Sequence, residues 1–367
     1  MFSIGILGFL VWSFFFSLFE EMVALSYREV GVINLAICWN SLTLLGTFSC
    51  KNLSSYTQSA GNRNFSINTS TSETICEISC QNFNTFFKLY SELGFTSSIS
   101  EHWLSWFVGF AEGDGAIVSY KGRPRFVLTQ KEESILNHIK NTLDFGTVRK
   151  IDTGGTVYYR YIVEDFKGVL LLALIFNGNL CLTHRVTQLS KWITEINLRL
   201  STPTSNIYGL CSNITLITTL FKPSITNAWL SGFTDAEGCF NVSINKRDNT
   251  VSGYRVILRF IIDQKNSLYL LTLIRDQFGY GKVIVRSKDM YRFYCNSCIG
   301  LSSVNSYFST FTLKSKKAVS YANWLKVYKM VLNKEHLTTQ GLERVRTLKK
   351  TININNSLNH KIGSAKP

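Results

Sequence analysis

A nine-residue pattern occurs twice in this chain and constrains its fold more than any other feature. Residues 107–115 are FVGFAEGDG and residues 230–238 are LSGFTDAEG, and both follow the order apolar, small, Gly, Phe, small, acid, small, acid, Gly. A Trp precedes each copy and a strand-like apolar segment follows it. A helix that ends in an acid and a Gly, repeated once, suggests a pseudo-twofold enzyme with one carboxylate from each half.

The segments after each copy repeat in the same order, which indicates duplication of a whole domain. Each half is expected to continue with two strands, a helix, two more strands and further helices. The first of these helices stops at Phe145-Gly146 in one half and at Phe278-Gly279 in the other, since Gly suits a helix C-terminus. The second half has a longer, basic, turn-like segment at 246–255. The joint at 201–227 contains two prolines and is expected to be a linker.

The charge of the chain is concentrated in its duplicated part. The formal net charge is +15, and residues 101–367 hold 35 basic and 18 acidic residues. An excess of this size favours a polyanionic partner, although a basic but inert surface is the alternative. The nine cysteines show no zinc-site spacing, which favours free thiols in a reducing compartment.

The two motif helices are expected to pack against each other. Small residues stand four positions apart in each of them: Gly109, Gly113, Gly232 and Ala236. Small residues at this spacing share one helix face and allow close backbone contact. The last acids, Asp114 and Glu237, would then converge and repel each other unless a cation such as Mg²⁺ lies between them. Such a metal beside a basic surface is suited to phosphodiester hydrolysis. One copy alone would more often be an ordinary helix end.

The two motifs resemble those of the LAGLIDADG homing endonucleases in their single-chain, two-motif form, over roughly residues 101–355. The resemblance implies an α+β fold of two pseudo-symmetric αββαββα domains with antiparallel, saddle-shaped sheets, preceded here by an apolar N-terminal extension. The domains would span 101–200 and 228–355, after an exon-like leader and flexible connector at 1–100. A monomer that binds a long, asymmetric double-stranded DNA target is expected.

The resemblance also implies roles for individual side chains. Asp114 and Glu237 would bind catalytic Mg²⁺ or Mn²⁺, whereas Glu112 and Asp235 would serve the helix interface. Further catalytic residues carried over by position are Gln130, Gln264 and Lys314, with Thr183 opposite Lys314 in the first half. The glutamines are alternatively ordinary polar residues at strand ends, and Lys314 a solvated helix start.

Recognition of the DNA sequence would fall to side chains on the groove-facing strands, where Arg and Lys pair with guanine and Asn and Gln with adenine. The candidate DNA-binding residues are Arg125, Lys246, Arg247, Arg255, Arg259, Lys282, Arg286 and Arg292. Strand alternation decides which of them face the groove.

Residues 1–19 form an uncharged apolar run long enough to span a bilayer. This run is similar to a transmembrane segment of cytochrome c oxidase subunit 1, which implies a mitochondrial intron reading frame translated in frame with its exon. The leader would insert into the membrane before trimming and release into the matrix. An unrelated membrane anchor is the alternative.

The leading functional hypothesis is a site-specific DNA endonuclease that promotes mobility of its host mitochondrial intron. The alternative is an RNA maturase that binds the host intron RNA and assists its splicing, with or without DNA cleavage. An inactive, degenerate protein is the third possibility. Intact acids at Asp114 and Glu237 favour cleavage, since a maturase has no need of them.

Overall fold

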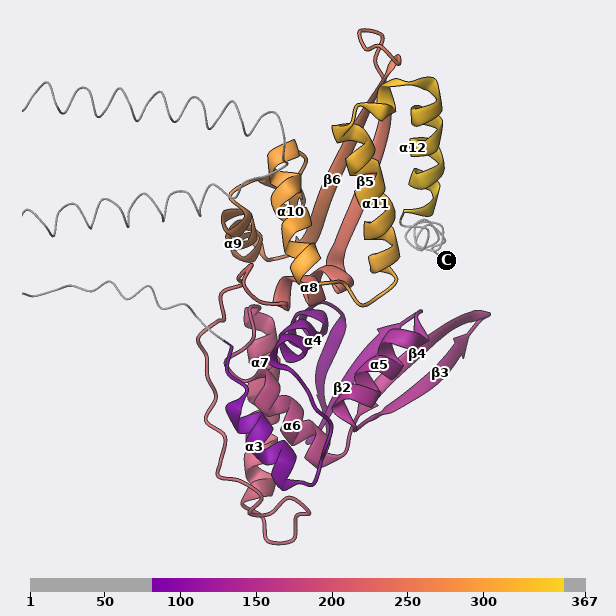
Figure 1. Cartoon of the computed structure of the whole chain (residues 1–367). Coiled ribbons are helices and arrows are strands. Elements are labelled where there is room, and N and C mark those ends of the chain that lie inside the picture. Colours follow the sequence, from indigo (N-terminus) through magenta and orange to yellow (C-terminus); the bar gives the residue numbers. More distant parts are fainter. Residues whose placement is uncertain (1–80, 353–367) are drawn as a thin grey trace, which may run out of the picture. The chain divides into compact units, whose positions relative to one another are not determined.

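The computed structural model describes residues 81–352, which lie within one compact unit (Figure 1). The apolar leader and most of the connector at 1–100 fall outside these residues. Within the described part, none of the helices combines the length and the apolarity needed to cross a bilayer.

Both halves confirm the predicted αββαββα order. The first half consists of α4 (Glu101–Asp114), β1 (Gly115–Tyr120), β2 (Arg123–Gln130), α5 (Glu133–Leu143), β3 (Thr147–Thr153), β4 (Thr156–Val163), α6 (Phe166–Phe176) and α7 (Thr183–Leu200). The second consists of α8 (Trp229–Glu237), β5 (Gly238–Lys246), β6 (Tyr254–Lys265), α9 (Leu268–Phe278), β7 (Lys282–Ser287), β8 (Met290–Cys295), α10 (Cys298–Thr310) and α11 (Lys317–Leu332). Outside this repeat lie α3 (Asn84–Glu92), η1 (Glu335–Leu337) and α12 (Thr339–Thr351).

Each half contains one four-stranded antiparallel sheet, which confirms the α+β class. The strand orders are β1-β2-β4-β3 and β5-β6-β8-β7. Successive side chains alternate between the two faces of a strand. In β2, Phe126 and Leu128 are buried beneath the helices, and in β6, Phe260 and Ile262 are buried in the same way. The side chains between them lie on the opposite face of each sheet.

The ends of the helices between the strand pairs differ between the halves. In α9 the predicted stop is confirmed, because Gly279 follows Phe278 with a left-handed φ of 70°. In α5 the helix ends at Leu143, and the left-handed residue that follows is Asp144, with φ of 61°, two positions before the predicted Gly146. Asp tolerates the left-handed region better than most residues with a side chain.

The two halves meet along the motif helices α4 and α8, which pack backbone to backbone as predicted. A methyl group on Gly109 would overlap the carbonyl oxygen of Trp229, and one on Gly232 would overlap the carbonyl oxygen of Trp106. One turn further on, a methyl group on Gly113 would strike the side chain of Ala236. We call this contact between α4 and α8 the seam. At its two closest points, Gly109 and Gly232, only glycine fits.

The joint between the halves is held against the first half. Asn197 binds the backbone of Ile214 through both its amide nitrogen, at 2.9 Å, and its oxygen, at 2.8 Å. Asn177 binds the backbone at Thr215 and Ile217 in the same way, at 2.9 and 2.8 Å. The predicted linker is therefore anchored along α6 and α7 by side chains that satisfy its exposed backbone groups.

Helix α3 was not predicted from the sequence. It buries Phe86, Leu89 and Tyr90 in the common core, and it contacts α6. The hydroxyl of Tyr90 also donates to the carbonyl of Leu143 at 3.1 Å. This part of the 1–100 segment is therefore packed on the first half.

Replacing the seam glycines with alanine is expected to destabilise the folded protein, although alanine favours an isolated helix. Alanine stabilises an isolated helix by about 1 kcal/mol relative to glycine. In Gly109→Ala and Gly232→Ala, however, the added methyl group meets a backbone carbonyl that no side-chain rotation can move. We expect a loss of about 3 kcal/mol in the free energy of unfolding, measured by urea titration. A gain in stability would show that α4 and α8 are further apart than the structure has them.

Candidate active site

Two carboxylates meet where the motif helices end. Asp114 is the last residue of α4 and Glu237 is the last residue of α8. A methyl group on Gly113 would lie 3.2 Å from Cγ of Glu237, so this side chain passes close to the opposing helix. Burial raises the pKa of Glu237 to about 7, and the nearby Asp114 carboxylate adds to the rise. Burial likewise raises the pKa of Asp114 above its ordinary value. The structure thus brings together the two acids predicted from the repeat.

The penultimate acids connect the two helices, as the sequence predicted. Trp229 of α8 donates its indole N–H to Glu112 of α4 at 2.8 Å, and Trp106 of α4 donates to Asp235 of α8 at 2.9 Å. Indole N–H groups buried in a core require such partners. Both acids are buried, and their oxygens are occupied by these hydrogen bonds within the protein.

Each penultimate acid also binds the loop that leads into the last helix of its repeat. Glu112 accepts hydrogen bonds from the backbone N–H groups of Cys181 and Leu182, both at 2.8 Å. Asp235 accepts them from Lys314 at 2.8 Å and Ser315 at 3.2 Å. This equivalence pairs Lys314 with Cys181, and not with Thr183 as the sequence alignment had it.

Two cations lie beside the acid pair, one from each half. Arg185 of α7 donates to the carbonyl of Glu112 at 2.9 and 3.1 Å. Lys317 of α11 donates its ammonium group to the carbonyls of Thr234 at 3.0 Å and Ala236 at 2.6 Å. Burial lowers the pKa of both cations, while the neighbouring carboxylates act in the opposite direction. Their positive charge thus offsets the carboxylates and the negative ends of both helix dipoles.

Lys317, and not Lys314, is the lysine that the structure places beside the acids. The side chain of Lys314 is exposed, and its amino group lies 5.7 Å from the centre of the Trp106 ring of α4. Three lysines occur within four residues here, at 314, 316 and 317. The sequence indicated that a lysine belongs in this segment, but only the start of α11 decides which one points inward.

The two glutamines are not equivalent. Gln130 donates its side-chain N–H to Asp114 at 2.5 Å, which helps to keep this carboxylate ionised. The side chain of Gln264, at the corresponding position of β6, makes no hydrogen bond within residues 81–352. The pseudo-symmetry of the fold therefore does not extend to the immediate surroundings of the two acids.

The donor set at this point fits a hard divalent cation. Mg²⁺ is commonly held by one or two carboxylates together with water and substrate phosphate oxygens. Asp114 and Glu237 supply two carboxylates whose mutual repulsion such an ion removes. No group of three or more His, Cys, Asp or Glu side chains between residues 81 and 352 is arranged to hold a metal ion. The remaining ligands would thus come from water and substrate.

Most of the predicted DNA-binding arginines lie on the sheet faces opposite the helices. In the second sheet, Arg255 and Arg259 alternate with the buried Leu258 and Phe260, and Arg259 donates to Asn241 at 3.2 Å and Ser243 at 2.8 Å. The same face carries Lys282, Arg286 and Arg292. In the first sheet Arg125 occupies this face, 3.3 Å from Glu164.

Two of the predicted DNA-binding residues lie elsewhere. Lys246 pairs with Tyr254 across the strands, and the Tyr254 ring faces Arg346 of α12 at 4.8 Å. Alternation therefore places Lys246 on the helix side of the sheet. Arg247 is in the turn between β5 and β6, where its N–H donates to the carbonyl of Gly253 at 2.9 Å.

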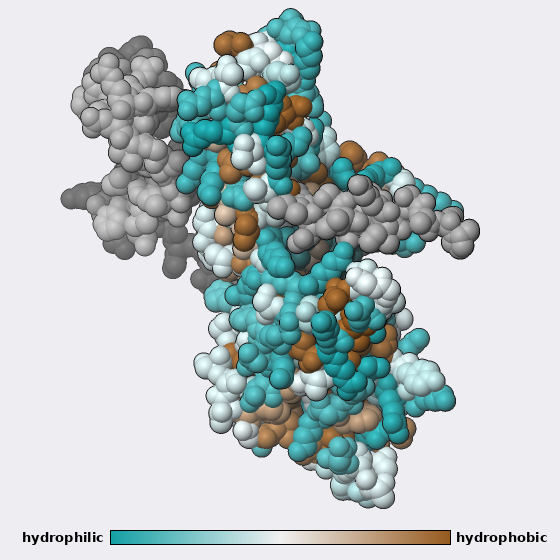
Figure 2. Space-filling view, turned by 90° about the vertical axis from the view of Figure 1, so that its right-hand side faces the viewer, coloured by the Kyte–Doolittle hydropathy of each residue, from teal (hydrophilic) through white to brown (hydrophobic). Residues whose placement is uncertain are grey.

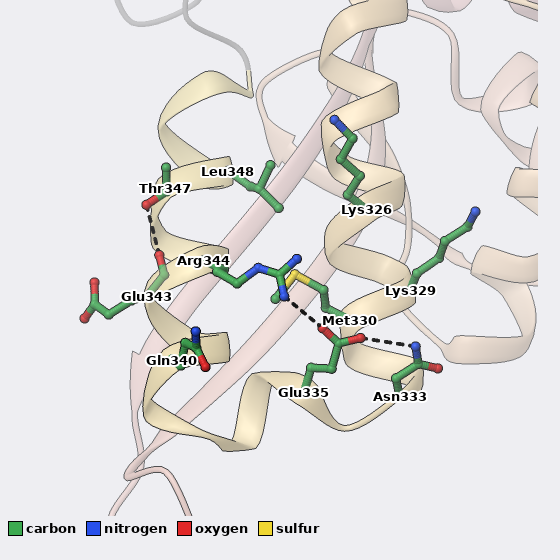
Figure 3. A pocket seen from close by; sticks show the side chains of 10 residues that line it. All are labelled: Lys326, Lys329, Met330, Asn333, Glu335, Gln340, Glu343, Arg344, Thr347 and Leu348. Carbon is green, nitrogen blue, oxygen red and sulfur yellow. Dashed lines mark hydrogen bonds and ion pairs between the residues drawn. The ribbon is translucent and has the colours of Figure 1, made fainter.

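Much of the protein surface in the view of Figure 2 is hydrophilic, with scattered hydrophobic residues. A cavity of about 710 Å³ opens between α11 and α12 (Figure 3), with Met330 and Leu348 among charged side chains. Glu335 in this cavity is paired with Arg344 at 3.5 Å and with Asn333 at 3.2 Å. None of its lining residues belongs to the acid pair or to its cations.

The comparisons with known proteins agree with one another. The family model described as "LAGLIDADG endonuclease" matches residues 107–196 and 230–328. A Neurospora crassa protein named "Probable intron-encoded endonuclease 4" is 36% identical over 260 residues, which cover 70% of this chain and 45% of that relative. An "Uncharacterized cox1 intron-2 37.2 kDa protein" of Schizosaccharomyces pombe is 29% identical over 65% of this chain and 69% of its own.

A solved structure with a similar fold is the LAGLIDADG meganuclease I-AabMI bound to uncleaved DNA. Its TM-score is 0.55 at 22% identity, with 68% of this chain and 99% of that one covered. At this identity the likeness concerns the fold. The chain also spans less than half of the Neurospora relative, which is the longer protein.

Glu237→Gln is expected to stabilise the metal-free protein at pH 8. The pKa of Glu237 is about 7 when folded, against an ordinary value of 4.5, so folding at pH 8 buries an ionised carboxylate. The gain, on the order of 3 kcal/mol, is nearly complete at pH 8 and disappears below about 4.5, where the carboxyl is protonated in both states.

The measurement is thermal unfolding with EDTA at pH 8, 6 and 4.5. Glu343→Gln is the matched control, because the Glu343 side chain is 61% exposed. A gain in melting temperature that is equal at all three pH values, or a loss at pH 8, would contradict the assignment of a buried, mutually repelling carboxylate pair.

Proposed function

Since the chain belongs to the LAGLIDADG endonuclease family, we propose that it is a metal-dependent, site-specific endonuclease that cuts both strands of a DNA target. The observation that carries this proposal is the convergence of Asp114 and Glu237 at the end of the helix seam. The seam lies between two sheets whose helix-free faces are rich in arginine. A polyanion bound across both sheets would pass the acid pair.

The chemistry follows from the groups around that point. Asp114 and Glu237 would hold divalent metal, Mg²⁺ or Mn²⁺, which when bound polarises the phosphate and lowers the pKa of a water ligand. Gln130 orients the Asp114 carboxylate through its hydrogen bond. Arg185 and Lys317 are fixed by backbone carbonyls, so their charge stays beside the carboxylates without occupying the carboxylate oxygens. These fixed cations stabilise negative charge that develops on the phosphate.

The two halves differ around their acids, which supports an asymmetric target. Asp114 has a glutamine partner and Glu237 has none within residues 81–352. The Schizosaccharomyces relative is named as a cox1 intron protein, and the Neurospora relative as intron-encoded. These names support a mitochondrial enzyme that promotes mobility of its host intron. The maturase function and the membrane-inserted leader remain predictions from the sequence.

Removal of either acid is expected to abolish cutting without loss of DNA binding. Asp114→Asn and Glu237→Gln keep the side-chain volume but remove the metal-binding charge, so cleavage should fall by at least about 100-fold. The assay uses the full chain, Mg²⁺ and DNA that spans the intronless exon junction, with affinity measured separately. Asp248→Asn, at an exposed turn, is the control. Loss of affinity equal to the loss of cutting would indicate a structural role instead.

The two lysines at the start of α11 give a second test. Lys317→Met removes the cation beside the acid pair, and we expect cleavage to fall by about 10- to 100-fold. Lys314→Met removes an exposed amino group near the Trp106 ring. A cation–π contact of this exposed kind stabilises a protein by only about 0.5–1 kcal/mol. The cleavage rate of this variant should stay within about threefold of the original. The reverse order of effects would restore Lys314 as the catalytic lysine.

A further inference from the structure

A cluster of three charged side chains lies on the helix-free face of the second sheet. Asp263 of β6 accepts hydrogen bonds from Arg292 of β8, with Nε at 2.6 Å from Oδ1 and Nη2 at 2.7 Å from Oδ2. Arg286 of β7 donates Nη1 to the same Oδ2 at 2.6 Å. Both oxygens of the carboxylate are therefore occupied by arginine, which leaves Asp263 unsuited to hold a metal ion.

The strand register places this cluster next to the acid pair. Gly238 pairs with Ile262, so Glu237 and Asp263 lie just beyond this pair at the end of the ladder, where Asp263 is close enough to help raise the pKa of Glu237. In the first half Gly115 pairs with Leu128, which brings Thr129 opposite Asp114. The additional carboxylate thus occurs in one half only, close to the centre of the surface proposed to bind DNA.

An acid is an unexpected residue at this position. A carboxylate on a surface that binds DNA repels the phosphates and lowers affinity. It does, however, fix the orientation of the two arginines before DNA binds, which reduces the entropy they lose on binding. Asp263 and Arg292 are only 24% and 26% exposed, so their contact is shielded from solvent. The arrangement is therefore better suited to recognising a particular base than to increasing the overall affinity for DNA.

The geometry of Arg292 leaves a particular edge available. Asp263 occupies Nε and one hydrogen of Nη2. The second hydrogen of Nη2 and both hydrogens of Nη1 form no bond with Asp263, and one from each nitrogen makes the pair that contacts the two acceptors of guanine, O6 and N7. An arginine held side-on by a carboxylate thus presents its terminal fork to a base.

We propose that Arg292, oriented by Asp263, recognises a guanine in the major groove near the centre of the target, on the side bound by the second half. This inference rests on the proposed function and adds a base preference to it. Arg286 also donates to the Asp263 carboxylate and helps to keep it ionised. The equivalent of Arg292 in the first half is Arg160, which pairs across the strands with Thr129 and has no acid beside it there. The guanine preference is therefore specific to one half-site.

The test is selection of bound duplexes from a randomised DNA library by the full chain, without divalent metal so that the DNA stays intact. Asp263→Thr copies the first half, and Arg292→Lys keeps the charge but removes the fork. Asp248→Thr is the control, because Asp248 contacts Lys246 at 3.7 Å in an exposed turn. Thermal unfolding confirms that each variant is folded, and Arg160→Lys identifies the half-site bound by the first half.

The original protein should select guanine at one position near the target centre. Both Asp263→Thr and Arg292→Lys should lose that preference by roughly tenfold or more, with other positions unchanged. Retention of the guanine preference in either variant, or a uniform loss of affinity for all sequences, would overturn the inference and leave the proposed function intact. If the original protein selects no sequence at all, the proposed function fails first.

Discussion

The backbone contact between α4 and α8 is the constraint on which the rest of the structure depends. Gly109 and Gly232 allow each helix to touch the carbonyl of a tryptophan on the other. The same tryptophans donate their indole N–H groups to the penultimate acids across the seam. Because the helices end together, the last residue of each reaches one point in space. Packing thus assembles a site that neither half contains alone.

This assembly concentrates negative charge, and the surrounding residues compensate it. Two helix C-termini and two carboxylates converge, and burial raises the pKa of both acids. Arg185 and Lys317 offset this charge from fixed positions on the backbone carbonyls. The residual repulsion is what a bound divalent cation would relieve. The burial of two repelling carboxylates lowers the stability of the fold at neutral pH, as functional sites commonly do.

The repeated fold carries an unequal site. Asp114 is held by Gln130, whereas Glu237 lies beside Asp263 and its two arginines. Equivalent positions along the register, Thr129 and Asp263, differ in charge. On the helix-free faces some equivalent positions carry the same side chain in both halves, as Arg125 and Arg259 do, while others differ, as Thr129 and Asp263 do. Such divergence is suited to two different DNA half-sites.

The sequence by itself determined the duplicated αββαββα order, the glycine seam and the two converging acids, because these depend on local periodicity and on spacing within one helix. It did not identify Lys317, the position of α3, the anchoring of the joint or the partners of Asp263. Those depend on where a helix starts and which strand face a residue occupies. A shift of one residue turns a side chain to the opposite face of a strand, and contacts distant in sequence decide that register. The tertiary structure alone therefore selected which lysine faces the site.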